Sequence, residues 1–95
     1  MKFIAIEEEL KPIDTVRNAA LLKEEAQVVW DLMQSGFLRE SYFKDDIWEA
    51  VLVFECESKA VVETSLARLP LVREGYIRFD VTGLRPYTGL QRLFG

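Results

Sequence analysis

Histidine is absent from this chain of 95 residues, and cysteine occurs only once, at Cys56. Histidine is the commonest metal ligand and the commonest general base near neutral pH. In an assembly built only from copies of this chain, the absence of histidine therefore excludes Ser-His-Asp and Cys-His catalysis. It also excludes any histidine-based zinc or iron site. A lone cysteine cannot form a disulfide within the chain, which favours a reducing compartment. Any proton transfer must fall to carboxylates, lysines, tyrosines or Cys56.

Basic residues are too few and too dispersed to predict a nucleic-acid-binding protein. The formal net charge is −4, and the arginines are spread along the chain instead of forming one run. No apolar stretch approaches the roughly 18 residues that a membrane span needs. The first ten residues, MKFIAIEEEL, do not have the apolar run and cleavage site of a signal peptide. We expect a cytoplasmic protein that binds neither nucleic acid nor membranes.

The length predicts a single domain over residues 1–95, because two separate cores would need a longer chain. A domain of this size buries only roughly 60–65% of its unfolded surface, so a permanent partner subunit would stabilise it. The tail, residues 84–95, would expose an apolar patch unless a neighbouring subunit covered it. Its apolar members are Leu84, Tyr87, Leu90, Leu93 and Phe94. We expect a homodimer or a higher homo-oligomer that the tail contacts.

The spacing of apolar residues predicts six elements in the order β-α-β-β-α-β. In the first helix the apolar positions step by three and four, and Gly36 ends it as a C-terminal glycine. The stripe that these positions form, which we expect to face the core, consists of Ala19, Leu22, Ala26, Val29 and Met33. Pro70 ends the second helix, for which Ser58 is a suitable N-cap. The strands are predicted at 2–9, 37–43, 46–56 and 76–81, and the helices at 15–35 and 58–69.

This order is that of the ferredoxin-like arrangement in the α+β class, a four-stranded antiparallel sheet with two helices on one face. The predicted strand at 46–56 is apolar on both faces at its centre. We therefore do not expect the open face of the sheet to remain exposed to solvent. Two such sheets packed face to face would form a dimeric α/β barrel that encloses a cavity.

Two segments resemble the muconolactone isomerases and their relatives in the dimeric α/β-barrel group. They are LLKEEAQVVWDLMQSGFLRES at 21–41 and LPLVREGYIRFDVTGL at 69–84, and the resemblance extends over most of the chain. It implies a cofactor-free isomerase that moves a proton on a small unsaturated lactone or a similar carboxylate. It also implies dimers or rings of dimers whose C-terminal tails reach neighbouring subunits.

The resemblance also implies roles for particular residues. Glu25 aligns with a family glutamate and becomes the acid/base candidate, and Arg39 aligns with an arginine suited to bind the substrate carboxylate in a bidentate manner. Lys23 lies one position from a family lysine, and Glu40 stands where the family has a histidine. The remaining predicted substrate-binding residues are Tyr42 and Trp48.

Each of these residues also has a structural interpretation. Glu25 fits the solvated face of an amphipathic helix, and Arg39, on the strand face of Ser41 and Phe43, fits a solvent-facing arginine. Tyr42 and Trp48 fit core or dimer contacts. No metal site is predicted, because the neighbouring residues at 7–9 alternate faces, and we interpret them as a solvated strand end.

Three function classes follow for the chain. The leading hypothesis is the isomerase, and the alternative is a noncatalytic small-molecule-binding or structural oligomer of the same fold. A cofactor-free monooxygenase of the related barrel group would need a pocket for a larger aromatic substrate. A closed polar pocket that holds Glu25 and Arg39 within reach of one ligand would favour the isomerase. A cavity filled by aromatic side chains would favour the binding protein.

Overall fold

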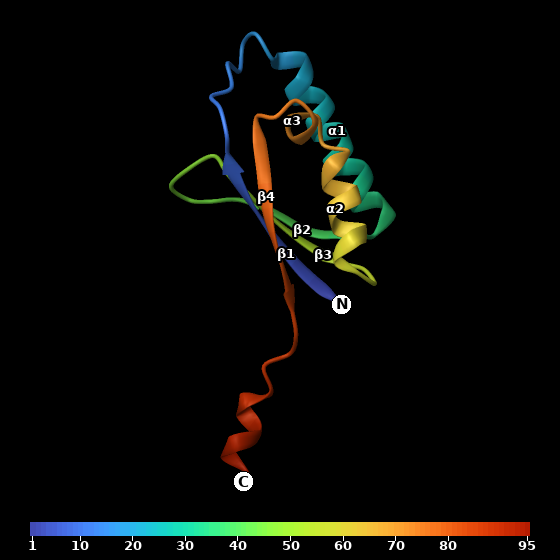
Figure 1. The fold of residues 1–95 in the computed structure, drawn as a ribbon, viewed down its shortest axis with the longest axis vertical. Helices are drawn as coiled ribbons and strands as arrows, with labels where there is room; N and C mark the ends of the chain where they lie inside the picture. Colours follow the sequence, from blue (N-terminus) through green and yellow to red (C-terminus); the bar gives the residue numbers. More distant parts are fainter.

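The computed structural model describes residues 1–95 and contains one four-stranded antiparallel sheet with the strand order β2-β3-β1-β4. The three α-helices cover one face of this sheet, whereas the C-terminal 3₁₀ helix lies away from it (Figure 1). This arrangement confirms the predicted α+β ferredoxin-like fold. The elements are β1 (Lys2–Glu9), α1 (Ala19–Ser35), β2 (Leu38–Phe43), β3 (Ala50–Glu55), α2 (Lys59–Ala67), α3 (Pro70–Arg73), β4 (Ile77–Leu84) and the 3₁₀ helix η1 (Thr88–Leu93).

The strand register decides which side chains face the helices. Ala5 of β1 lies opposite Leu52 of β3 and Val81 of β4, and directly opposed residues share a face of the sheet. Leu52 and Phe54 are buried on that face, as their alternation predicts. The core cluster consists of Phe3, Ala5, Leu32, Leu38, Leu52, Phe54, Val62, Leu66 and Leu69.

Three predicted boundaries differ from the structure by three residues or more, and the first is the end of β4, which extends to Leu84 and not only to residue 81. β3 begins at Ala50 and not at residue 46, so Trp48 lies in the preceding loop and is 82% exposed. α1 begins at Ala19 and not at Thr15, and residues 15–18 form a turn in which the Asp14 carboxylate accepts the backbone N–H groups of Val16 and Arg17 at 3.0 Å each. This is the hydrogen-bonding pattern of an N-cap, and the Asn18 N–H donates to the Asp14 carbonyl oxygen as in a helical turn, so the helical path starts earlier than the regular α-helix.

The end of α1 is as predicted. Gly36 has φ 85°, a left-handed conformation that glycine adopts without a steric penalty, and its N–H donates to the Met33 carbonyl oxygen. The buried side of the helix is rotated from the predicted stripe, because Leu32 is fully buried whereas Ala26 and Met33 are exposed. Part of the stripe therefore faces the space beside the sheet instead of its centre.

The second half of the chain repeats the same plan with one addition. Ser58 caps α2 as predicted, since its Oγ accepts the Val61 N–H at 3.4 Å. Pro70 does more than end that helix, because it opens the short helix α3 at a position where a missing N–H is tolerated. α3 brings the backbone of Leu71 against α1.

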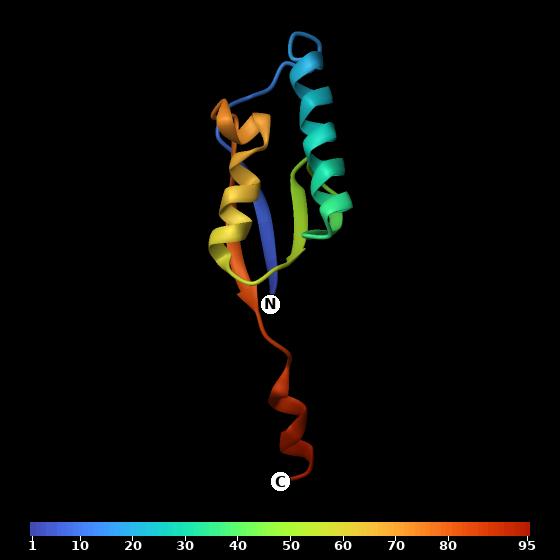
Figure 2. The same cartoon turned by 90° about the vertical axis from the view of Figure 1, so that its right-hand side faces the viewer.

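Two apolar surfaces remain uncovered in the single chain. The open face of the sheet presents Ile4 and Ile6 of β1 beside Val51 and Val53 of β3. The tail extends away from the body (Figure 2), and its Phe94 side chain is 89% exposed.

None of the helices has the length and apolar character that crossing a membrane requires.

Candidate functional site

A cleft of about 720 Å³ opens between α1, the adjacent ends of β2 and β3, and α3. We call it the α1 cleft. Its volume lies in the range of small-molecule sites. Its wall is largely apolar, with residues Ile13, Leu22, Ala26, Val29, Phe43, Trp48, Ala50, Leu52 and Leu71. The polar lining residues are Thr15, Ser41, Tyr42 and the carboxylates Glu7, Glu9 and Glu25.

Glu25 lies half-buried on the wall that α1 forms. Its Oε1 accepts the backbone N–H of Leu71 at 3.0 Å. This N–H belongs to the first turn of α3 and has no acceptor within its own helix, which explains why a carboxylate is held there. Burial raises the pKa of Glu25, the Leu71 hydrogen bond opposes this effect, and the charge of Glu7 raises the pKa further.

Glu7 lies half-buried in the same cleft, and its Oε1 accepts the backbone N–H of Ala50 at 3.2 Å. Burial is the largest cause that raises the pKa of this carboxyl, and the Ala50 hydrogen bond opposes it. The charges of Glu49 and Glu9 raise the pKa as well, whereas Lys44 lowers it. The interpretation of Glu7 from the sequence, as part of a solvated strand end, is therefore wrong.

The alternation of β1 already carries the signal that places Glu7. Residues two apart in a strand share a face, so Glu7 continues the face of the buried Phe3 and Ala5. Glu8 points to the opposite face and contacts Arg78 at 2.6 Å. The run of glutamates thus divides between a cleft and the open face of the sheet.

The cations nearest to the cleft carboxylates are engaged elsewhere. Lys44 contacts Glu49 Oε1 at 2.9 Å. Arg73 lies 3.5 Å from Glu24 and 3.3 Å from Glu74. No lysine or arginine is among the residues that line the cleft. The carboxylates of Glu7 and Glu25 therefore have no direct ionic partner.

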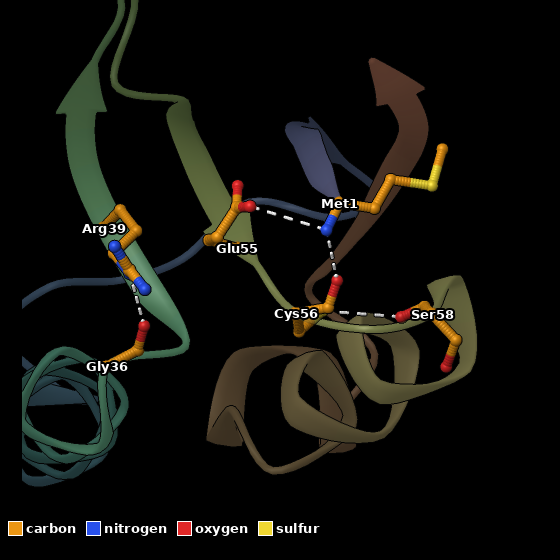
Figure 3. A network of polar contacts seen from close by, with 6 residues as sticks. All are labelled: Met1, Gly36, Arg39, Glu55, Cys56 and Ser58. Carbon is orange, nitrogen blue, oxygen red and sulfur yellow. Dashed lines mark hydrogen bonds and ion pairs between the residues drawn. The ribbon is translucent and has the colours of Figure 1, made fainter. Parts of the chain in front are cut away.

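Arg39 lies outside the α1 cleft, beside the C-terminal end of α1 (Figure 3). Its Nε donates to the Gly36 carbonyl oxygen at 2.6 Å. The pairing of β2 with β3 shifts register between Leu38 and Glu40, so Arg39 sits in a bulge. A bulge re-aims a side chain, which is why Arg39 does not continue the face of Ser41. The structure therefore does not bring Arg39 and Glu25 together.

The other predicted substrate-binding residues divide between the cleft and the surface. Lys23 is exposed on α1 and does not line the cleft. Tyr42 and Trp48 contribute to the lining. The Tyr42 hydroxyl donates to Glu40 Oε1 at 2.6 Å, and Trp48 packs edge-to-face on Phe43 with ring centroids 5.2 Å apart. One cleft thus gathers Glu25, Tyr42 and Trp48.

No family model and no curated protein matches the sequence. Among solved structures, the chain is similar to the crystal structure of muconolactone isomerase, with a TM-score of 0.78 and 22% sequence identity over 93% of this chain and 92% of that one. It is also similar to 5-chloro-2-hydroxyhydroquinone dehydrochlorinase from Burkholderia phenoliruptrix in complex with 2,5-dihydroxybenzoquinone. That match has a TM-score of 0.70 and 14% identity over 90% of this chain and 94% of that one. These likenesses show a shared fold, and they bear out at that level the resemblance seen in the sequence.

Proposed function

We propose that the chain is a muconolactone isomerase-like enzyme that shifts a proton on a small unsaturated ring compound without a cofactor, with Glu25 as the acid/base. The observation that carries this proposal is the position of Glu25 on the wall of a mostly apolar cleft. Its raised pKa suits a group that must both accept and return a proton near neutral pH. The names of both similar structures refer to small ring compounds, which supports a ligand of this size.

The proton shift needs only one carboxyl group. Ionised Glu25 removes a proton from the carbon next to the ring carbonyl, and the electron pair moves onto the carbonyl oxygen to give a dienolate. The same carboxylic acid then returns the proton to the far carbon of the allylic system, and the C=C bond moves by one position. The hydroxyls of Thr15 and Ser41 are donors in the lining that can stabilise the enolate oxygen.

The test of the proposed reaction is proton exchange between solvent and substrate. We expect the wild type in D₂O to introduce deuterium into unsaturated γ-lactones, measured by proton NMR. Glu25→Gln should slow the exchange by about 10²–10⁴-fold, because a general base contributes that factor. The matched control is Glu24→Gln, which removes the neighbouring, more exposed carboxylate and should keep the wild-type rate. Equal exchange in Glu25→Gln and wild type would refute the assignment.

The second candidate is a noncatalytic binding or structural oligomer of the same fold. The position of Arg39 and Lys23 outside the cleft favours it, because the predicted carboxylate clamp is not assembled around Glu25. A wild-type protein that binds lactones but exchanges no deuterium would support this candidate.

We further propose that the chain assembles as a homodimer through the open face of the sheet, with the tail covering a neighbouring subunit. The uncovered Ile4, Ile6 and Val53 on the sheet and the exposed Phe94 in the tail support an assembly. The single domain over 1–95, the tail at 84–95 and a cytoplasmic location stay predictions.

Deletion of residues 88–95 tests the proposed role of the tail. Because the tail extends away from its own body, its removal should leave the fold intact and reduce the assembly size or the melting temperature. Sedimentation velocity measures the size. Arg92→Gln serves as a control that keeps the apolar side chains of the tail. An unchanged sedimentation profile and melting temperature after the deletion would argue against a tail-mediated contact.

A further inference from the structure

The α1 cleft carries charge of one sign only. Three carboxylates line it, from Glu7, Glu9 and Glu25, and no lysine or arginine does. Glu7 and Glu25 come from different elements, β1 and α1, so the fold itself places both in one cleft. A negatively charged ligand would lose part of its hydration and meet carboxylates in place of a cation.

The other charged groups near Glu7 and Glu25 do not neutralise the excess negative charge of the cleft. Glu49 and Lys44 lie near Glu7, but they pair with each other at 2.9 Å. Glu24 and Arg73 lie near Glu25, and they are also partners, at 3.5 Å. Each nearby cation is thus matched by a nearby carboxylate, which leaves the cleft carboxylates as the excess charge.

The rest of the wall suits an uncharged ring. Phe43 and Trp48 meet at an interplanar angle of 84° and present aromatic surface to the cleft, and Leu22 and Leu71 contribute aliphatic surface. Apolar walls with a few fixed polar groups are typical of sites for compact organic molecules. An uncharged ring would gain these apolar contacts without electrostatic repulsion from the carboxylates.

We propose that the α1 cleft admits uncharged ring compounds that bear a carbonyl group and excludes their carboxylates, with Glu7 as the specificity-determining residue. The carbonyl in this statement rests on the proposed function of Glu25, whereas the selection by charge rests on the lining alone. The substrate class therefore differs from the carboxylate-bearing lactone that the sequence resemblance implies.

Among the three carboxylates, Glu7 is the one to test. Glu9 is exposed at the rim, and Glu25 is assigned to the reaction itself. Glu7 is half-buried, and its position is fixed by the Ala50 N–H. Glu7→Gln removes the charge and keeps a side-chain oxygen that can accept this hydrogen bond. The substitution therefore changes the charge of the cleft with little change in shape.

The probes are muconolactone, its methyl ester and its 2-aminoethyl amide, which share one ring and differ in charge. Binding to the full chain in its solution assembly is measured by titration calorimetry at pH 7, so a basic residue from a second copy would contribute if present. We expect the ester to bind at least about tenfold more tightly than the carboxylate. Glu7→Gln should tighten carboxylate binding by about tenfold and leave ester binding within roughly twofold.

The control is Glu57→Gln, which removes one charge from an exposed position outside the cleft and should leave the ester-to-carboxylate ratio unchanged. Circular dichroism verifies that both variants are folded. Equal binding of ester and carboxylate by wild type would overturn the proposal, as would identical ratios in Glu7→Gln and Glu57→Gln. The aminoethyl amide should bind at least as tightly as the ester, because the carboxylates that repel an anion attract a cation. Binding of the amide that is no tighter than that of the carboxylate would also overturn the proposal.

This experiment separates the proposal from the proposed reaction. If the ester binds selectively but exchanges no deuterium, the selection by charge stands and the assignment of Glu25 as acid/base fails. If muconolactone itself binds tightly and is exchanged through Glu25, the reaction stands and the selection by charge fails.

Discussion

The α1 cleft and a second groove, between α2 and β4, are similar in size. They differ in whether the charged side chains that line them are paired with an opposite charge. The α2 groove has a volume of about 570 Å³ and includes Lys59, Glu63, Arg78 and Asp80. Its charges are paired, since Lys59 lies 3.9 Å from Glu63 and Arg78 lies 2.9 Å from Asp80. The α1 cleft holds only carboxylates, and two of them have raised pKa values. Uncompensated, half-buried charge of this kind is typical of functional sites, whereas paired surface charge is not.

Two neighbouring residues of β1 show the same contrast within one strand. Glu8 is exposed and contacts Arg78, so its charge is compensated at the surface. Glu7 faces the helices and is half-buried without a cation of its own. The strand alternation alone separates a surface ion pair from a cleft carboxylate. The chemistry of a glutamate here depends on its face of the sheet more than on its place in the sequence.

The largest expected difference between the two cavities is in ligand affinity after each is filled by a tryptophan side chain. Ala26 lines the α1 cleft and Ala67 lines the α2 groove, and both are exposed on helices. Ala26→Trp should weaken binding of the methyl ester of muconolactone by more than about tenfold, because the indole occupies the space of the ligand. Ala67→Trp should change this affinity by less than roughly twofold. Calorimetry measures both. The reverse order of effects would place the ligand site in the α2 groove.

The stability of the fold should respond to the charge of the cleft. We expect Glu7→Gln to raise the free energy of unfolding at pH 7, because burial disfavours the ionised Glu7 carboxylate and the neutral amide can keep the hydrogen bond to Ala50. For a domain of this size, a gain of about 1 kcal/mol would raise the melting temperature by roughly 4–8 °C. Glu63→Gln, in the α2 groove, should give no comparable rise. Thermal unfolding followed by circular dichroism provides the measurement.

The sign of the pH dependence follows from the raised pKa of Glu7. Between its ordinary value of 4.5 and its higher folded-state pKa, the folded protein binds more protons than the unfolded chain. The free energy of unfolding therefore falls as the pH rises through this window. The advantage of Glu7→Gln should be present at pH 7 and vanish below pH 4.5. An advantage that grows on acidification would contradict the raised pKa.

The smallest effect is expected from the paired charges beside the α2 groove. Arg78 contacts both Glu8 and Asp80, and all three side chains are about half exposed or more. Arg78→Gln should lower the melting temperature by less than Glu7→Gln raises it, because exposed ion pairs contribute little to stability. The difference should disappear in 1 M NaCl, where such pairs are screened. A large loss of stability that persists at high salt would show that these charges are not ordinary surface pairs.

The order of elements and the end of α1 could be predicted from sequence because they depend on local chemistry. Gly36 ends α1 through its own backbone freedom, and Ser58 caps α2 through its own hydroxyl. The predicted start of α1 differs by four residues, because residues 15–18, which the Asp14 side chain caps, form a turn and not yet a regular α-helix. The start of β3 was wrong because the apolar residues near Trp48 belong to the loop.

The candidate site could be predicted only in part, because a site depends on contacts between distant elements. Glu25 was found from the resemblance, but its hydrogen bond to Leu71 joins residues 46 positions apart. Glu7 was assigned to a solvated strand end, although its alternation with Phe3 and Ala5 carried the opposite signal. Arg39 was placed by simple alternation, which the bulge in β2 interrupts. No pattern within the segment predicted that bulge.

The most direct test of the account is the titration of the Glu25 carboxyl carbon, followed by ¹³C NMR in the wild type and in Glu7→Gln. Glu25 should titrate above 4.5 in the wild type, because it is half-buried beside Glu7. In Glu7→Gln its pKa should fall toward 4.5, and in Glu57→Gln it should keep the wild-type value. A Glu25 that titrates at or below 4.5 and does not respond to Glu7→Gln would contradict the proposed acid/base site.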